Sequence, residues 1–234
     1  MSVSAIIVAG GKGIRMGAAT RKQYMLLAGK PIVCHTLEVF DACPCIEEIF
    51  LVVPPDDLDT CAEKWITSLT LHKTIHLVAG GIERQESVYL GIQAVSGRQC
   101  EVVVIHDAVR PFVSSRMIEA CVAEARVSGA CIVGMPAMDT AKRVNSGRIE
   151  RTLDRNTIWM AQTPQAFDLN LIRTAHEKAG SERFLGTDDA MLVERLGHKI
   201  RIIAGSRLNM KITTPEDLAL AEGIMDRKSL HCLV

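Results

Sequence analysis

Residues 5–17 read Ala-Ile-Ile-Val-Ala-Gly-Gly-Lys-Gly-Ile-Arg-Met-Gly, and residues 21–24 continue Arg-Lys-Gln-Tyr. An apolar run of strand length ends abruptly in glycines, which let backbone amides turn closely around an anion. The four cations of this segment stand within eleven positions and are Lys12, Arg15, Arg21 and Lys22. Such a density of positive charge favours a triphosphate over a dinucleotide, whose loops mainly use backbone amides and a helix dipole. The stretch therefore predicts a phosphate-binding turn after a first buried strand.

Two common nucleotide-binding motifs are absent from this turn. A Walker loop needs Ser or Thr after its Gly-Lys pair, and here Gly13 follows Lys12. A dinucleotide-binding turn needs a third glycine at the position that Met16 occupies. A solvated basic loop without any ligand stays open as the alternative, because such loops are common on protein surfaces.

The composition is that of an ordinary globular protein. Of the 234 residues, 48% are hydrophobic and 23% are charged, and the formal net charge is zero. A balanced charge gives no general attraction to nucleic acid or to a membrane surface, so an anion site must be a local cluster of cations. No basic leader and no apolar run of about eighteen residues is found, so we expect a cytoplasmic protein. Most of the eight cysteines lie inside apolar runs, which predicts buried free thiols rather than disulfides.

Strand-like and helix-like segments alternate along the chain. Strand patterns cover residues 3–9, 49–53, 75–78, 102–106, 131–135 and 200–204. Helical spacing covers residues 31–40, 58–69, 83–94, 115–127, 169–178, 188–196 and 215–225. This alternation predicts an α/β, Rossmann-like fold, in which helices cover both faces of a mostly parallel sheet. Ligands of such sheets bind beyond the carboxyl ends of the strands.

Residues 136–164 interrupt the alternation. Short alternating runs flank an Asn-Ser-Gly turn at residues 145–147, which is typical of a β-hairpin. We find no linker or repeat, so we expect a single domain over residues 1–234 with this hairpin as a protruding arm. An isolated hairpin is marginal in water unless it packs against something, and an excursion of this length is usually functional.

Polar residues follow several of the predicted strands. Asp107 comes directly after a buried run, and Arg110 follows three positions later. A carboxylate that faces a triphosphate is a candidate ligand for Mg²⁺, and the alternative is an aspartate that caps the turn and pairs with Arg110. A glycine turn at residues 80–81 opens a helix that contains Ser87, and Lys211 precedes a helix cap at Thr214. We expect Lys211 and Asp107 to share one rim of the sheet.

A set of motifs occurs in a fixed order: Arg15-Met16-Gly17, Arg21-Lys22-Gln23-Tyr24, His106-Asp107-Ala108-Val109-Arg110-Pro111, Thr140-Ala141-Lys142-Arg143, Leu153-Asp154-Arg155-Asn156, Thr163-Pro164-Gln165, Thr187-Asp188-Asp189-Ala190 and Asn209-Met210-Lys211-Ile212-Thr213. Together they resemble the 2-C-methyl-D-erythritol 4-phosphate cytidylyltransferase family of the non-mevalonate isoprenoid pathway. The likeness spans nearly the whole chain. It implies the nucleotidyltransferase fold and a reaction in which the acceptor phosphate attacks the α-phosphorus of CTP and releases pyrophosphate.

The resemblance also implies roles for individual residues. Catalytic roles fall to Arg15, Lys22, Arg155 and Lys211. Nucleotide binding falls to Ala9, Gly10, Gly11, Lys12, Gly13, Gly81, Ser87 and Ala108. Substrate binding falls to Asp107, Arg110, Thr140, Arg155 and Thr187. Asp107 would hold Mg²⁺, and in the family the arm delivers Thr140 and Arg155 to the site of a neighbouring subunit, so the working unit would be a homodimer.

Three other functions stay open at this point. Ribitol-5-phosphate cytidylyltransferases share the glycine loop, the aspartate motif and Thr-Pro-Gln, although the arm motifs resemble the methylerythritol enzymes more closely. Another sugar-phosphate nucleotidylyltransferase is the second alternative. A nucleotide-binding regulator without catalytic activity is the third.

Overall fold

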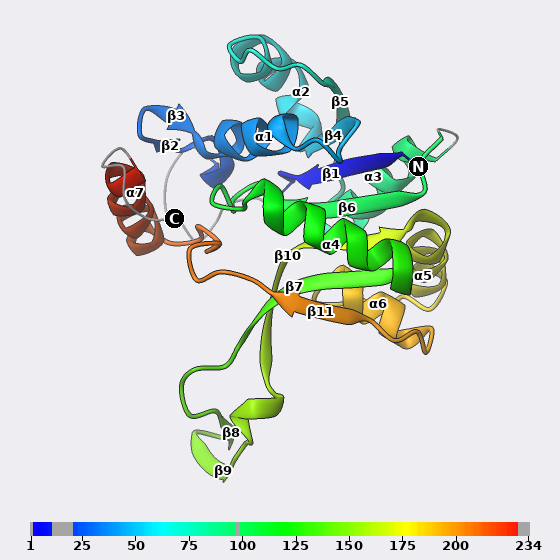
Figure 1. Ribbon diagram of the computed structural model, residues 1–234, viewed down its shortest axis with the longest axis vertical. Coiled ribbons are helices and arrows are strands. Elements are labelled where there is room, and N and C mark those ends of the chain that lie inside the picture. The colour runs from blue at the N-terminus through cyan, green and yellow to red at the C-terminus, as the bar shows by residue number, and fades with distance from the viewer. Residues whose placement is uncertain (1, 11–20, 97–98, 229–234) are drawn as a thin grey trace.

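Seven strands form one sheet in the order β11-β7-β10-β6-β1-β4-β5 (Figure 1). The computed structural model describes residues 2–10, 21–96 and 99–228. The strands are β1 (Val3–Val8), β4 (Glu48–Val53), β5 (Thr74–Ala79), β6 (Val102–Asp107), β7 (Ala130–Pro136), β10 (Trp159–Asp168) and β11 (Arg201–Ala204). Only β10 runs antiparallel to its two neighbours, β6 and β7. The mostly parallel sheet of the prediction is therefore confirmed.

Strands β1, β4 and β6 end at the same edge of the sheet. Val8 lies opposite Asp107 of β6 and opposite Val52 of β4. Backbone hydrogen bonds continue just beyond the strands, from Ala9 N to Val52 O at 2.8 Å and from Ala108 N to Val8 O at 3.0 Å. The predicted binding turn and the predicted aspartate consequently leave adjacent strands at one edge.

Helices cover both faces of the sheet, as the sequence predicts (Figure 1). Side chains of α1 (Ile32–Ala42) and α4 (Ser115–Ser128) pack with Ile7 in one buried cluster. Side chains of α3 (Arg84–Val95), α5 (Leu169–Ser181) and α6 (Asp189–Arg195) pack with Ile6 in a second cluster. Successive strand residues point to opposite faces, so each face buries its own apolar set and holds its own layer of helices.

A third, smaller apolar cluster lies beside the edge of the sheet where β1, β4 and β6 end. It joins α7 (Pro215–Lys228) to the short strand pair β2 (Leu26–Leu27) and β3 (Lys30–Pro31) through Leu27, Ile212 and Ala221. The predicted helix over residues 58–69 is less regular than expected: α2 spans only Leu58–Thr60, and a π-helical segment follows over Cys61–Ile66. No helix in the described part of the chain is long and apolar enough to cross a membrane.

The arm leaves the sheet after β7 and returns through β10 (Figure 1). Its tip is the antiparallel pair β8 (Lys142–Asn145) and β9 (Arg148–Thr152), closed at Ser146 and Gly147 with φ of 48° and 77°. A two-residue turn with positive φ at both positions fits the right-handed twist of a hairpin, which confirms the predicted turn. The predicted boundary at residue 164 is wrong, because residues 159–161 already pair with β7 and the following residues continue β10.

Candidate active site

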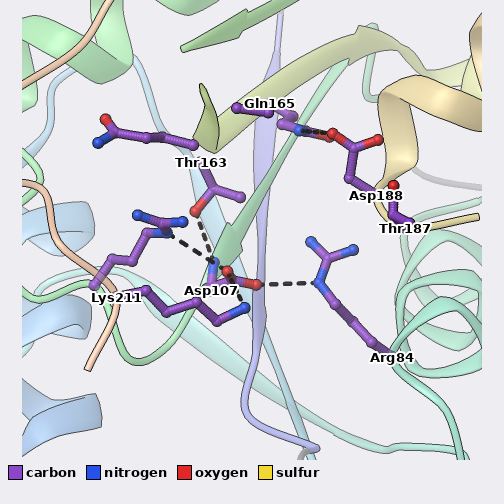
Figure 2. Close-up of a pocket in the computed structure, with 10 residues that line it drawn as sticks. Arg84, Asp107, Thr163, Gln165, Thr187, Asp188 and Lys211 are labelled. Atoms are coloured by element: carbon purple, nitrogen blue, oxygen red, sulfur yellow. Dashed lines mark hydrogen bonds and ion pairs between the residues drawn. The ribbon is translucent and has the colours of Figure 1, made fainter. Parts of the chain in front are cut away.

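Three cationic side chains converge on Asp107 at the end of β6 (Figure 2). Arg84 Nε lies 3.1 Å from Asp107 Oδ1, and Lys211 Nζ lies 2.8 Å from Oδ2. Arg110 Nε lies 3.5 Å from Oδ2. The cations come from the start of α3, from the turn after β6 and from the segment before α7. Three separate parts of the chain therefore place positive charge around one carboxylate that is only 8% exposed.

The cations keep this carboxylate ionised. Burial by itself would raise the pKa of Asp107, but the charges of Arg84, Lys211 and Arg110 overcome burial and hold the pKa well below its ordinary value. Asp107 thus serves as a fixed counter-ion for three cations. Phosphate oxygens that enter this site could take over the partners of Asp107, because cations bind phosphate as well as carboxylate.

Arg84 is held from two sides. Its Nη1 lies 2.8 Å from Asp189 Oδ2 on α6, while its Nε faces Asp107. The second oxygen of Asp189 lies 3.2 Å from His176 Nε2, and both of these side chains are buried. Burial would raise the pKa of Asp189, but Arg84 and His176 lower it below its ordinary value. Two carboxylates therefore fix the orientation of the Arg84 guanidinium in advance of any ligand.

A cavity of about 260 Å³ opens beside this cluster. Its lining residues are Arg84, Asp107, Arg110, Ala161, Gln162, Thr163, Gln165, Thr187, Asp188 and Lys211. Of the residues singled out in the sequence, the cavity brings together Asp107, Arg110, Thr187 and Lys211. Polar and charged groups predominate in this lining, as a site for phosphates requires.

The glycine turns of the sequence meet at the neighbouring strand end. The backbone N–H of Gly81 donates to Ser87 Oγ at 3.1 Å. A Cβ at Gly10 would lie 2.7 Å from the same oxygen, so this close approach requires glycine. The side chain of Gln23 donates to Ala9 O at 2.6 Å, which fixes the short helical turn over Lys22–Tyr24 against the end of β1. Lys22 is thereby placed at the same edge of the sheet.

A model of the 2-C-methyl-D-erythritol 4-phosphate cytidylyltransferase family matches residues 3–227. The chain belongs to this family. The chain is 50% identical over 230 residues to a cytidylyltransferase of this name from Geobacter metallireducens, with 97% of this chain and 99% of the relative covered. A relative of the same name from Geotalea uraniireducens is 45% identical over 226 residues, covering 96% and 97%. Both likenesses cover the sheet, the site and the arm.

Solved structures agree with this assignment. The 4-diphosphocytidyl-2C-methyl-D-erythritol synthase of Anaerococcus prevotii superposes with a TM-score of 0.86 at 32% identity, and covers 97% of this chain and 96% of its own. The 2-C-methyl-D-erythritol 4-phosphate cytidylyltransferase of Thermus thermophilus gives 0.80 at 30% identity, covering 97% and 100%. The chain therefore has the fold of a methylerythritol cytidylyltransferase, and the family is one of nucleotidyltransferases.

Some residues that the family resemblance implies lie away from the cavity or outside the described residues. Thr140 and Arg155 are exposed on the arm, where Arg155 Nη1 donates to the backbone oxygen of Met138 at 2.9 Å. Neither residue lines the cavity of its own chain. The predicted residues outside the described ranges are Gly11, Lys12, Gly13 and Arg15.

The carboxylates of this cytidylyltransferase suit a metal that arrives with phosphate. Among the described residues, no group of three or more His, Cys, Asp or Glu side chains could form a protein cage for a metal ion. Asp188 lines the same cavity as Asp107, but it accepts hydrogen bonds from Gln165 Nε2 and from the backbone N–H of Met191. Asp107 is itself paired with three cations, so it could hold Mg²⁺ only where phosphate oxygens take over some of these cations. Mg²⁺ commonly uses one or two carboxylates together with phosphate oxygens.

Sequence reasoning missed several residues of the site. Arg84 received no role, although it stands three positions after Gly81 and begins α3. Thr163, Gln165 and Asp188 were recognised only as parts of motifs. The sequence feature that could have revealed them is a polar side chain inside or beside an otherwise apolar segment. In this fold these segments meet where β10 passes the end of β6.

Proposed function

We propose that this chain transfers the cytidylyl group of CTP to 2-C-methyl-D-erythritol 4-phosphate and releases pyrophosphate. The observation that carries the proposal is the convergence of Arg84, Arg110 and Lys211 on one edge of a nucleotidyltransferase sheet. Family membership over nearly the whole chain supports the choice of nucleotide and acceptor. We place the reaction in the cytoplasm, where CTP is available.

The reaction is an in-line substitution at phosphorus. An oxygen of the acceptor phosphate forms a bond to the α-phosphorus of CTP, and the bond from that phosphorus to the bridging oxygen breaks, so pyrophosphate leaves with the bonding electrons. The attacking oxygen is already anionic, and the reaction therefore requires placement and charge stabilisation rather than a general base. Arg15 and Lys22 would stabilise the charge that accumulates around the α-phosphorus. Lys211 would hold the phosphates where the two substrates meet.

A bound Mg²⁺ would supply charge neutralisation for the phosphate oxygens. Asp107 would hold it, once phosphate oxygens have taken over part of the cationic partners of this carboxylate. The geometry supports this assignment in that Asp107 is ionised and lines the cavity.

The arm would complete the site of a second copy of the chain. Apolar side chains on the arm are exposed, with Val144 at 55% and Ile149 at 65%, and Leu153 and Ile158 are half-buried. Exposed apolar groups on a two-stranded extension gain stability when a partner covers them. In such a homodimer Arg155 and Thr140 would bind the acceptor phosphate in the site of the neighbouring subunit.

A substrate panel tests the proposal. Purified protein is given CTP and Mg²⁺ with 2-C-methyl-D-erythritol 4-phosphate, ribitol 5-phosphate or a sugar 1-phosphate, and released pyrophosphate is measured. We expect turnover with the methylerythritol phosphate at a kcat/KM well above that with the other acceptors. Preference for ribitol 5-phosphate or a sugar 1-phosphate would reassign the acceptor. Nucleotide binding without pyrophosphate release from any acceptor would indicate a regulator.

A further inference from the structure

A closed circuit of hydrogen bonds lies behind the cavity. His106 Nε2 lies 3.2 Å from the backbone oxygen of Arg110, and Arg110 Nη1 donates to the backbone oxygen of Asn209 at 2.8 Å. Asn209 Nδ2 donates to the backbone oxygen of Thr163 at 2.8 Å. Thr163 Oγ1 lies 3.1 Å from His106 Nδ1, which closes the circuit. The circuit joins three segments: the end of β6, the middle of β10 and the segment before α7.

The direction of each hydrogen bond follows from its partners. The carbonyl oxygen of Arg110 can only accept, so His106 Nε2 carries the proton. Both ring nitrogens of His106 face neutral oxygens, so the fully buried ring is neutral and its Nδ1 is an acceptor. The hydroxyl of Thr163 must then donate to Nδ1. Its oxygen is left to accept the backbone N–H of Asp107, which lies at 3.1 Å.

We propose that His106, Thr163 and Asn209 are positioning residues that fix the spacing of Asp107, Arg110 and Lys211. The circuit fixes the backbone N–H of Asp107 and both the backbone oxygen and the guanidinium of Arg110. It also fixes Asn209, which stands two positions before Lys211. Its three side chains are buried, with exposed fractions of 0% for His106, 3% for Thr163 and 0% for Asn209. Both nitrogens of the His106 ring, the Thr163 hydroxyl and Asn209 Nδ2 have hydrogen-bond partners, and buried groups paired in this way have few alternative arrangements.

The consequence for catalysis rests on the proposed function. Charges that stabilise a transition state lose effect when they are displaced by even about 1 Å, while ground-state binding tolerates such a shift better. Loss of the circuit should therefore lower kcat more than it raises the KM for CTP. If the circuit had a purely structural role, its loss would lower the stability of the protein without lowering kcat more than it raises the KM for CTP.

Thr163→Val and Thr163→Ser form the test pair. Valine keeps the shape but leaves the Asp107 N–H and His106 Nδ1 without their partner, whereas serine retains the hydroxyl. We expect Thr163→Val to lower kcat about tenfold or more with a KM for CTP within about threefold, and Thr163→Ser to stay near the unmodified enzyme. Equal kcat values for the two variants would overturn the proposal.

Ser128→Ala is the matched control, because Ser128 Oγ is within hydrogen-bonding distance of the backbone oxygens of Glu124 and Ala130 at the opposite edge of the sheet. It should lower stability and leave kcat unchanged. If Thr163→Val does not fold, Asn209→Ser breaks the circuit at another point and should give the same loss of kcat. An unchanged kcat in Asn209→Ser would equally contradict the positioning role.

Nitrogen NMR of histidine-labelled protein provides a test that does not depend on the acceptor. The circuit requires the proton of the His106 ring to lie on Nε2 at neutral pH, and requires Thr163→Val to change the Nδ1 signal. A His106 that carries its proton on Nδ1 would disprove the circuit whatever the enzyme acts on. Failure of the substrate panel with an intact His106 signal would refute the proposed acceptor and leave the circuit standing, and the kcat comparison would then use the acceptor that the panel identifies.

Discussion

Lys211 Nζ lies 2.8 Å from Asp107 Oδ2, although Lys211 lies in the segment before α7 and Asp107 is the last residue of β6. The pair forms at the carboxyl edge of the sheet, where open α/β sheets bind their ligands. Each of the two side chains therefore has a partner of opposite charge. Entry of a polyphosphate would replace a carboxylate partner of Lys211 with a phosphate partner, so the site would keep its cations paired before and after binding.

Arg84→Lys should weaken both the fold and the reaction. A lysine ammonium cannot reproduce the two-sided contact of the guanidinium with Asp107 and Asp189, and it would leave a buried carboxylate poorly paired. We expect a loss of about 1–3 kcal/mol in the free energy of unfolding, measured with urea, and a fall in kcat. Arg201→Lys is the control, because its ion pair with Glu124 lies at the surface and should contribute at most about 0.5 kcal/mol. Equal losses in the two variants would contradict the bridging role of Arg84.

Removal of divalent metal should abolish turnover. The carboxylates that line the cavity, Asp107 and Asp188, already have partners, so Mg²⁺ would be held mainly by nucleotide phosphates. Calorimetry should therefore detect Mg²⁺ binding to the protein with CTP present and little without it. Excess EDTA should stop pyrophosphate release, and added Mg²⁺ should restore it. Full activity in EDTA would refute the metal requirement.

His106 should make stability fall in mild acid. The unfolded chain takes up a proton at this residue near pH 6.5, whereas the folded protein does so only near pH 3, so protons favour the unfolded state between these values. The contribution of His106 to the free energy of unfolding is therefore highest above pH 6.5, and about 2 kcal/mol of it should be lost by pH 5. Urea unfolding of the natural protein and of His106→Asn at both pH values measures the difference. A difference between the two proteins that does not change with pH would show that His106 is not held neutral.

The arm should act in the neighbouring subunit. Arg155→Ala should impair use of the acceptor phosphate while CTP binding stays nearly normal, and Lys22→Ala should mainly lower kcat. After the two inactive variants are mixed and subunits exchange, some sites would combine an intact Lys22 with an intact Arg155 of the other chain. Partial recovery of activity is therefore expected. Absence of recovery after verified exchange would mean that each site is built within one chain.

The sequence predicted the sheet well because buried parallel strands are continuous apolar runs with a clear signal. It missed β10, which contains Pro164 and an irregularity in its pairing between Ala161 and Gln165, so neither alternation nor a continuous apolar run marks it. It also missed Arg84, because an arginine after a glycine turn is ordinary until the fold brings Asp107 and Asp189 to it. Contacts between distant segments depend on strand order, which local patterns do not specify.

We propose that cytidylyl transfer takes place at the cations around Asp107, and phosphorus NMR follows this transfer itself. With CTP, Mg²⁺ and 2-C-methyl-D-erythritol 4-phosphate, the natural protein should produce the coupled signals of a new diphosphate together with free pyrophosphate. Lys211→Met keeps much of the side-chain length without the charge and should slow both signals about a hundredfold or more. Absence of the diphosphate with the natural protein would refute the transfer, and its undiminished formation by Lys211→Met would show that the reaction does not depend on these cations.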